Sequence, residues 1–292
     1  MNGTMVETDT LNLRQPEKSN QKSADNQNHL SNGSATPKGE TQSDNHAVKN
    51  GVVPVKAVEG FDNVDQTDAT QYLNNYKAHK TGISHEEMVQ VYTQWATDYD
   101  KDLCPGRYNG PVLAAAAMAS HYSEELRPLV NILDVAAGTG RVGEELSKVG
   151  FKKIDALEPS PGMLKVLIDR NIYTKTFESA IGLKPVEAIQ SDTYDSLVIA
   201  GGMGEGHIPV KAVDEMIRVV KPGGTIFIVM REEYLTYVKE YVERLEPYMN
   251  ELEAKGFWKQ IGRDVVPEYS FKKNGIVFSY EVLPAESTRL TN

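Results

Sequence analysis

The residues best suited to chemistry lie in one short segment, 132–140, which reads ILDVAAGTG. An apolar run ends around the carboxylate of Asp134, and Gly138 and Gly140 follow just before an amphipathic segment that begins at Arg141. Glycines in such a turn let a ligand approach the backbone closely and leave the N-terminus of the next helix open to it. The segment therefore predicts a cofactor site at the end of a strand.

A second carboxylate, Glu158, follows the next apolar run, residues 153–157. An acidic side chain at this place can accept hydrogen bonds from both hydroxyls of a ribose, so it indicates an adenosine-containing cofactor. The alternative interpretation is a solvated carboxylate at a strand end. Its position directly after an apolar strand favours the functional interpretation.

Two features bear on which adenosine cofactor is bound. Gly138, Gly140 and Gly143 satisfy the dinucleotide pattern GxGxxG, which is a weak signal when it stands alone. The position of Asp134 in the strand end and the turn KPGG at 221–224 are not features that hydride-transfer enzymes require. They favour S-adenosylmethionine over a nicotinamide cofactor.

The elements that must position these residues alternate between strand and helix from residue 129 onward. This alternation predicts an α/β fold in which helices cover both faces of a mostly parallel sheet. A capping box at Ser84–Glu87 starts a helix over about 84–102, and a second helix is expected over about 111–126. The strands are expected at 130–135, 153–157, 173–177, 196–200, 225–230, 261–266 and 276–283, the last two antiparallel, and the helices at 141–149, 161–169, 210–220 and 232–255, the last kinked at Pro247.

Composition limits the remaining possibilities. Residues 1–60 contain no aromatic side chain and are predicted to be a disordered tail, residues 61–82 a linker with a short helix at about 68–79, residues 83–286 the catalytic domain, and residues 287–292 a flexible end. The net charge of −10 argues against broad nucleic-acid binding. The single cysteine, Cys104, the missing signal pattern and the lack of a long apolar run predict a cytoplasmic or nuclear protein without a membrane span or metal site.

Taken together, these motifs resemble those of the class I S-adenosylmethionine-dependent methyltransferases, and more closely the Williams–Beuren syndrome region methyltransferase-like family. The closer resemblance rests on YTQWATDYD at 92–100, EPSPGML at 158–164 and GGMGEGH at 201–207. It covers roughly residues 78–285. The family usually has Asp where Glu158 stands and often Cys where Ala137 stands. The resemblance implies a Rossmann-like, mostly parallel seven-stranded sheet with an antiparallel C-terminal strand, preceded by N-terminal helices.

The same resemblance implies a role for each site residue. Asp134 and the backbone of the turn should hold the methionyl part, Glu158 the ribose, and the end of the fourth strand should border the transferable methyl group. Tyr99 is expected to contact the cofactor from the N-terminal helix. The full expected set is Tyr99, Asp134, Ala136, Gly138, Thr139, Gly140, Glu158, Pro159, Met163, Ala180, Ile181, Ala200 and Gly201.

The acceptor is less well defined by the sequence. His207, in the glycine-rich loop after the fourth strand, is a candidate general base, although it could equally be a residue that shapes the loop. Tyr92 and Trp95 could cover the cofactor or simply pack on the sheet. The negative charge favours a small-molecule acceptor. A non-catalytic protein that binds S-adenosylmethionine or S-adenosylhomocysteine and a nicotinamide-dependent oxidoreductase stay open as alternatives.

Overall fold

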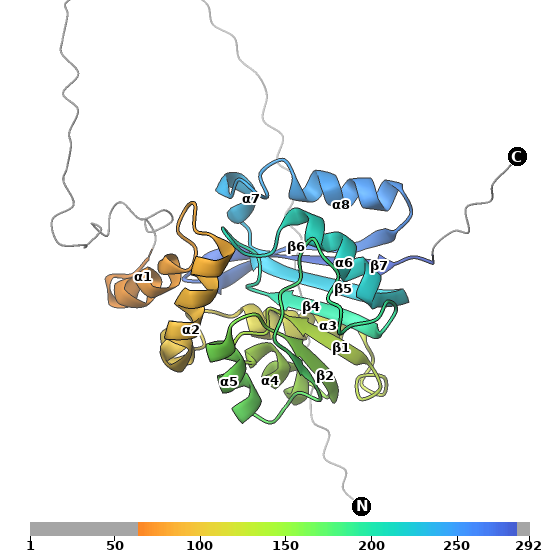
Figure 1. Ribbon diagram of the computed structural model, residues 1–292, viewed down its shortest axis with the longest axis horizontal. Coiled ribbons are helices and arrows are strands. Elements are labelled where there is room, and N and C mark those ends of the chain that lie inside the picture. The colour runs from red at the N-terminus through yellow and green to blue at the C-terminus, as the bar shows by residue number, and fades with distance from the viewer. Residues whose placement is uncertain (1–63, 285–292) are drawn as a thin grey trace, which may run out of the picture. The chain divides into compact units, whose positions relative to one another are not determined.

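A seven-stranded sheet forms the centre of the protein (Figure 1), for which the computed structural model describes residues 64–284. Its strands have the order β3-β2-β1-β4-β5-β7-β6. All neighbours pair in parallel except β7, which runs antiparallel to both β5 and β6. The bounds are β1 Asn131–Val135, β2 Lys153–Leu157, β3 Thr176–Phe177, β4 Tyr194–Ala200, β5 Val220–Arg231, β6 Trp258–Ser270 and β7 Lys273–Val282. This confirms the predicted mostly parallel sheet with an antiparallel C-terminal strand.

The strand order reverses between β1 and β4. The chain adds β2 and β3 on one side of β1, then crosses to place β4 and β5 on the other. In open α/β sheets, ligands bind at the carboxyl ends of the strands at such a reversal. The glycine turn that follows β1 therefore lies at the expected place for a cofactor.

Helices cover both faces of the sheet and bury two large apolar cores, beside a smaller cluster that includes Leu164 and Leu167 of α5. On one face, α6 and α8 pack on apolar residues that include Leu133, Leu197 and Ile226. On the other face, α3 and α4 pack on Ile132, Val198 and other residues of alternate positions. The helices are α1 Ala69–Lys77, α2 His85–Asp102, α3 Gly110–His121, α4 Arg141–Lys148, α5 Pro161–Asp169, α6 Val213–Val219, α7 Tyr234–Tyr237 and α8 Leu245–Ala254, with short 3-10 turns η3 Gln66–Asp68 and η4 Val210–Ala212.

The N-terminal helices are attached to the carboxyl-end side of the sheet. Ser84 and Glu87 form the predicted capping box at the start of α2. Thr93 in the middle of this helix hydrogen-bonds to Ser160 just before α5 (Oγ1 to Oγ, 2.9 Å). A Cβ on Gly162 would lie only 2.4 Å from the Thr93 carbonyl oxygen, so the glycine lets the two helices cross closely.

The long helix predicted over 232–255 is wrong. The chain instead forms α7 and α8, joined by turns that include Glu243 at a positive φ of 54°. Pro247 does not kink a helix but lies in the first turn of α8, where its missing N–H has no intrahelical acceptor to lose. Apolar residues of both α7 and α8 pack on the same core. One long helix would present its apolar residues to that core in the same way, so the apolar periodicity alone predicted a single helix.

A smaller difference concerns the two edge strands of the sheet. The strand expected at 173–177 is reduced to β3, and the strand expected at 261–266 extends to the longer β6. The short helix expected at 68–79 is present as α1. The predicted tail 1–60 and the predicted flexible end 287–292 lie outside the described residues. Among residues 64–284, no helix is both long and apolar enough to cross a bilayer.

Candidate functional site

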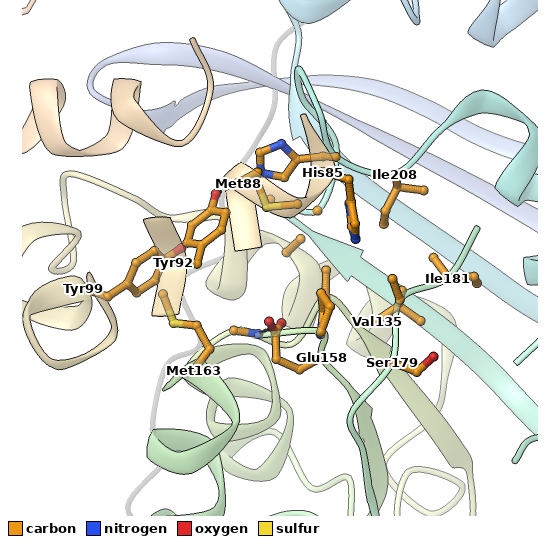
Figure 2. A pocket seen from close by; sticks show the side chains of 18 residues that line it. His85, Met88, Tyr92, Tyr99, Val135, Glu158, Met163, Ser179, Ile181 and Ile208 are labelled. Carbon is orange, nitrogen blue, oxygen red and sulfur yellow. Dashed lines mark hydrogen bonds between the residues drawn. The ribbon is translucent and has the colours of Figure 1, made fainter. Parts of the chain in front are cut away.

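The candidate site is a pocket of about 610 Å³ above the carboxyl ends of β1, β2 and β4. Figure 2 shows Tyr92, Tyr99 and Met163 on one side of it and Ser179 and Ile181 on the other. Its walls come from α2, the glycine turn, the start of α5, the loop after β3 and the loop after β4.

The turn after β1 lines the pocket and has an unusual backbone conformation. Gly138 and Gly140 have positive φ values of 57° and 88°, and Ala136 adopts a φ of 54°, which is costly for a residue with a Cβ. Strained backbone of this kind is found preferentially at ligand sites. Ala136 and Gly138 both line the pocket, so the strain lies where a cofactor would touch the backbone.

Glu158 is buried beside this turn, with 5 % of its surface exposed. Its Oε2 accepts from the Gly138 N–H and its Oε1 from the Ser160 N–H, each at 2.8 Å. Burial raises the pKa of the Glu158 carboxyl to about 7, although these two backbone hydrogen bonds lower it. Each carboxylate oxygen keeps a second lone pair, so the side chain can still accept from two hydroxyls.

Asp134 lies beneath the turn and does not line the pocket. Its Oδ2 accepts from the Tyr173 hydroxyl at 2.6 Å, while its Oδ1 is buried without a partner among the described residues. The Tyr173 hydroxyl in turn accepts from the Gly143 N–H at the start of α4. Burial raises the pKa of Asp134 to about 7 against the lowering effect of the Tyr173 hydrogen bond. The structure thus places Asp134 as a support of the turn, and its direct contact with a methionyl group stays a prediction.

A charged cluster attaches α2 to the glycine turn. The Thr139 hydroxyl donates to Asp100 Oδ1 at 2.6 Å. Arg170 forms an ion pair with the same aspartate and with Glu144 Oε2 (Nη1 to Oε2, 2.5 Å), and its Nε donates to the Thr139 carbonyl. Thr139 therefore faces this cluster rather than the main pocket, and it connects the helix above the site to the turn below it.

Aromatic side chains of α2 form the upper wall. Tyr92 and Tyr99 line the pocket, whereas Trp95 is buried and donates its indole N–H to Asp102 Oδ2 at 2.8 Å. The two tyrosine rings lie 6.2 Å apart. Aromatic rings attract cations, so the two tyrosines that line the pocket suit a sulfonium group, whereas Trp95 belongs to the packing of the helix.

His207 lies on the pocket wall in a defined protonation state. Its Nδ1 lies 2.7 Å from the Glu205 carbonyl oxygen, which requires a proton on Nδ1. Its Nε2 is then the unprotonated nitrogen and accepts from the Tyr92 hydroxyl at 3.0 Å. Burial lowers the pKa of His207 to about 4, so the ring is neutral near pH 7. The structure thus joins the candidate base to the aromatic wall.

A second, smaller cavity adjoins the first, with about 330 Å³ of empty space that includes its opening to solvent. Tyr92, Tyr99 and Gly201 line both cavities, so the two meet at the end of β4. A Cβ on Gly201 would lie 2.5 Å from the Tyr108 hydroxyl, so only glycine lets that hydroxyl approach the strand end. The second cavity thus opens at the strand end that, by the family resemblance, is expected to border the transferable methyl group.

The structure brings most of the predicted site residues together. Those that line the first pocket are Tyr99, Ala136, Gly138, Glu158, Pro159, Met163, Ala180, Ile181, Ala200, Gly201 and His207. Asp134, in β1, and Thr139 and Gly140, in the turn itself, do not line that pocket. The prediction omitted His85, Met88 and Ile208, which also line it. Met88 stands one helical turn before Tyr92, so the apolar face of α2 contained the signal for it.

The pocket fits S-adenosylmethionine on several independent counts. Glu158 provides a carboxylate for ribose hydroxyls, and the apolar side chains of Met163 and Ile181 provide surfaces for a purine. Glu158 and Asp134 are buried carboxyls to which no cation is paired among the described residues. Glu158 lines the pocket, so the positive charge of a bound cofactor with a sulfonium and an ammonium group would favour its ionised form.

Comparisons with known proteins agree with this geometry. A family model described as a methyltransferase domain matches residues 132–224. Human methyltransferase-like protein 27 is 31% identical over 173 residues, which cover 59% of this chain and 69% of that protein. A demethylmenaquinone methyltransferase from Renibacterium salmoninarum is 35% identical over 101 residues, which cover 35% of this chain and 41% of that protein.

The fold comparison points in the same direction. The structure of an S-adenosylmethionine-dependent methyltransferase from Leishmania major superposes with a TM-score of 0.52 at 15% identity, covering 71% of this chain and 89% of that one. Similarity at this identity shows the fold alone. The sequence relatives decide between the two cofactors considered above, in favour of S-adenosylmethionine. The chain belongs to the class I S-adenosylmethionine-dependent methyltransferases, in the family that includes human methyltransferase-like protein 27.

Proposed function

We propose that this methyltransferase transfers the methyl group to a small molecule bound in the second cavity. The observation that carries the proposal is the junction of the two cavities at Gly201, between Tyr92 and Tyr99. The second cavity is small and is walled by buried side chains, which suits a compact acceptor rather than a polymer. The net charge of −10 also disfavours a nucleic-acid acceptor.

The cofactor, when bound, supplies a methyl group that its sulfonium already activates for in-line displacement. The protein then has to hold both reactants in line and keep water out. Glu158 would hold the ribose, the backbone of Ala136 and Gly138 would face the methionyl part, and α2 would close the pocket from above. The new bond forms between the methyl carbon and the acceptor atom as the carbon–sulfur bond breaks and its electrons stay on sulfur.

His207 stays the candidate general base, and the hydrogen bond from Tyr92 defines how it would work. A proton from the acceptor would pass to the Tyr92 oxygen as the tyrosine gives its own proton to His207 Nε2. Because the pKa of His207 is low, its ring is neutral and has a nitrogen free to accept a proton, but for the same reason it is a weak base. This relay therefore suits an acceptor whose nucleophile is already acidic.

The names of two relatives support a small acceptor. One is the demethylmenaquinone methyltransferase from Renibacterium salmoninarum, and another is a mitochondrial ubiquinone biosynthesis O-methyltransferase from Dictyostelium discoideum, 24% identical over 135 residues. This chain spans about two fifths of the length of each, so their acceptors do not transfer directly to it. The cytoplasmic location predicted from the sequence stays a prediction.

Methyl labelling tests the proposal. Purified protein is incubated with S-adenosylmethionine carrying a deuterated methyl group and with a metabolite extract, and the products are analysed by mass spectrometry. We expect a labelled low-molecular-weight product whose formation is suppressed by excess S-adenosylhomocysteine. Label found only in protein or nucleic acid would refute the small acceptor. Cofactor binding without any labelled product would favour the non-catalytic alternative.

A further inference from the structure

The second cavity contains a buried cation that the cofactor site does not use. Arg231, at the end of β5, lines this cavity and is only 4 % exposed. Its Nη2 donates to Ser270 Oγ at 3.1 Å and its Nη1 to Glu233 Oε1 at 3.2 Å. Its Nε is buried and has no hydrogen-bond partner among the described residues. A buried guanidinium with a free donor is costly unless a ligand completes it.

The charges around Arg231 do not cancel. Glu233 is shared, because its other oxygen accepts from Lys273 Nζ at 2.9 Å. Two cations therefore share one carboxylate, and the group keeps one net positive charge. Glu232, the neighbouring acid, accepts from the Asn274 amide (3.2 Å) and is not among the residues that line the cavity. In a chain of net charge −10, a buried positive group that lines a cavity stands out.

Aromatic side chains make up about half of the rest of the cavity wall. Tyr234 packs against the guanidinium at 5.4 Å from ring centroid to Cζ, and Tyr108 and Tyr269 pair edge to face at 5.4 Å. His79 stacks on His207 at 4.5 Å and donates from Nδ1 to the Asn75 carbonyl at 2.9 Å, so its Nε2 is unprotonated. Flat apolar faces combined with one cationic group fit a flat molecule that carries an anion.

We propose that Arg231 makes this cavity selective for a small aromatic acceptor that carries a carboxylate. The proposal rests on the proposed function, since it assigns the acceptor class to the same cavity. The guanidinium would bind the carboxylate through Nε, and the tyrosine rings would enclose the aromatic part. The far end of the acceptor would then point toward Gly201 and the cofactor pocket. A cationic acceptor would be repelled, and a neutral one would leave the guanidinium uncompensated.

Methionine methyl groups allow each cavity to be observed separately. Met203 lines the second cavity, whereas Met88 and Met163 line the first. The full chain is labelled with carbon-13 in its methionine methyl groups and saturated with S-adenosylhomocysteine. We then titrate 4-hydroxybenzoate, 4-hydroxyphenylacetate and indole-3-acetate, each beside its neutral primary amide. Addition of S-adenosylhomocysteine by itself should shift the Met88 and Met163 signals.

We expect at least one carboxylate to shift Met203 and to bind about ten-fold or more tightly than its amide, as charge-assisted hydrogen bonds to a buried guanidinium imply. Arg231→Met should abolish this preference and leave the affinity for S-adenosylhomocysteine unchanged. Arg231→Lys should keep part of it, because the charge remains without the planar fork. Lys273→Met leaves Arg231 in place but removes the second cation on Glu233, and with it the net positive charge of the group, so it should weaken the preference without abolishing it.

The failures of the two proposals are distinguishable. No shift of Met88 and Met163 with S-adenosylhomocysteine would count against the cofactor site and hence the proposed function. If Met88 and Met163 shift normally with S-adenosylhomocysteine but each amide binds as tightly as its carboxylate at Met203, the proposed acceptor class is wrong and the proposed function stands. The same conclusion follows if no carboxylate binds at all. The comparison of acid and amide uses the unmodified protein, so it decides the question even where Arg231→Met fails to fold.

Discussion

Replacing Glu158 by glutamine isolates the charge of the proposed ribose anchor. In the parent protein the carboxylate accepts from two backbone N–H groups and has lone pairs left for two hydroxyls. Each charge-assisted hydrogen bond contributes roughly 1.5–3 kcal/mol. The amide keeps the volume, but its NH₂ group cannot accept from a backbone N–H or from a hydroxyl. We expect a loss of about 1.4–2.8 kcal/mol, which is 10–100-fold in affinity for S-adenosylhomocysteine.

The pH dependence sharpens this prediction. Burial raises the pKa of Glu158 in the free protein to about 7. Ribose hydroxyls stabilise the ionised carboxylate, so the pKa is lower in the complex than in the free protein. Affinity should therefore be complete above about pH 7 and fall as the pH drops through that value. The ratio of parent to Glu158→Gln affinity should be largest at pH 8 and shrink toward pH 6.

Isothermal titration calorimetry at pH 6, 7 and 8 measures these affinities directly. Glu158→Asp is the matched control, because it keeps the charge and should cost less than the glutamine change. Thermal unfolding should differ little between the variants, since the glutamine relieves a buried charge while it leaves one backbone donor unsatisfied. If Glu158→Gln binds S-adenosylhomocysteine as well as the parent at pH 8, the reasoning is wrong and the ribose is held elsewhere.

Three further predictions concern the parts around the site. Hydrogen exchange in α2 should slow when S-adenosylhomocysteine binds, because Tyr92 and Tyr99 line the pocket; unchanged exchange there would make α2 a packing element only. Gly162→Ala should lower the free energy of unfolding by about 1–3 kcal/mol in thermal unfolding, since its Cβ would lie 2.4 Å from the Thr93 carbonyl oxygen. The control Gly182→Ala should be neutral, because no atom lies within 4 Å of its Cβ, and equal effects of the two changes would contradict the close helix crossing. A chain that starts at residue 61 should bind the cofactor within a few-fold of the full chain by calorimetry, and a loss of ten-fold or more would show that the tail contributes to the site.

Much of the cofactor site could be predicted because its residues follow strand ends that the sequence marks clearly. The turn after Asp134 and the carboxylate at 158 are each adjacent in the chain to an apolar run, and parallel strands bring their carboxyl ends to one edge. Tyr99 could be predicted as a pocket residue from the family resemblance and from its position on the apolar face of its helix. The same local logic gave the wrong result for residues 232–255, because periodicity cannot separate one long helix from two short ones on the same core.

The sequence by itself determined the fold class and the place of the glycine turn, and it favoured S-adenosylmethionine over a nicotinamide cofactor, since all three depend on patterns within short stretches of chain. Only the tertiary structure decided that Thr139 faces Asp100 and Arg170, and that Asp134 supports the turn from beneath. It also decided that Arg231 faces a cavity with an unpartnered Nε. These contacts join side chains that are far apart in the chain, and their geometry is set by how helices and strands pack. No local pattern of residue types specifies it.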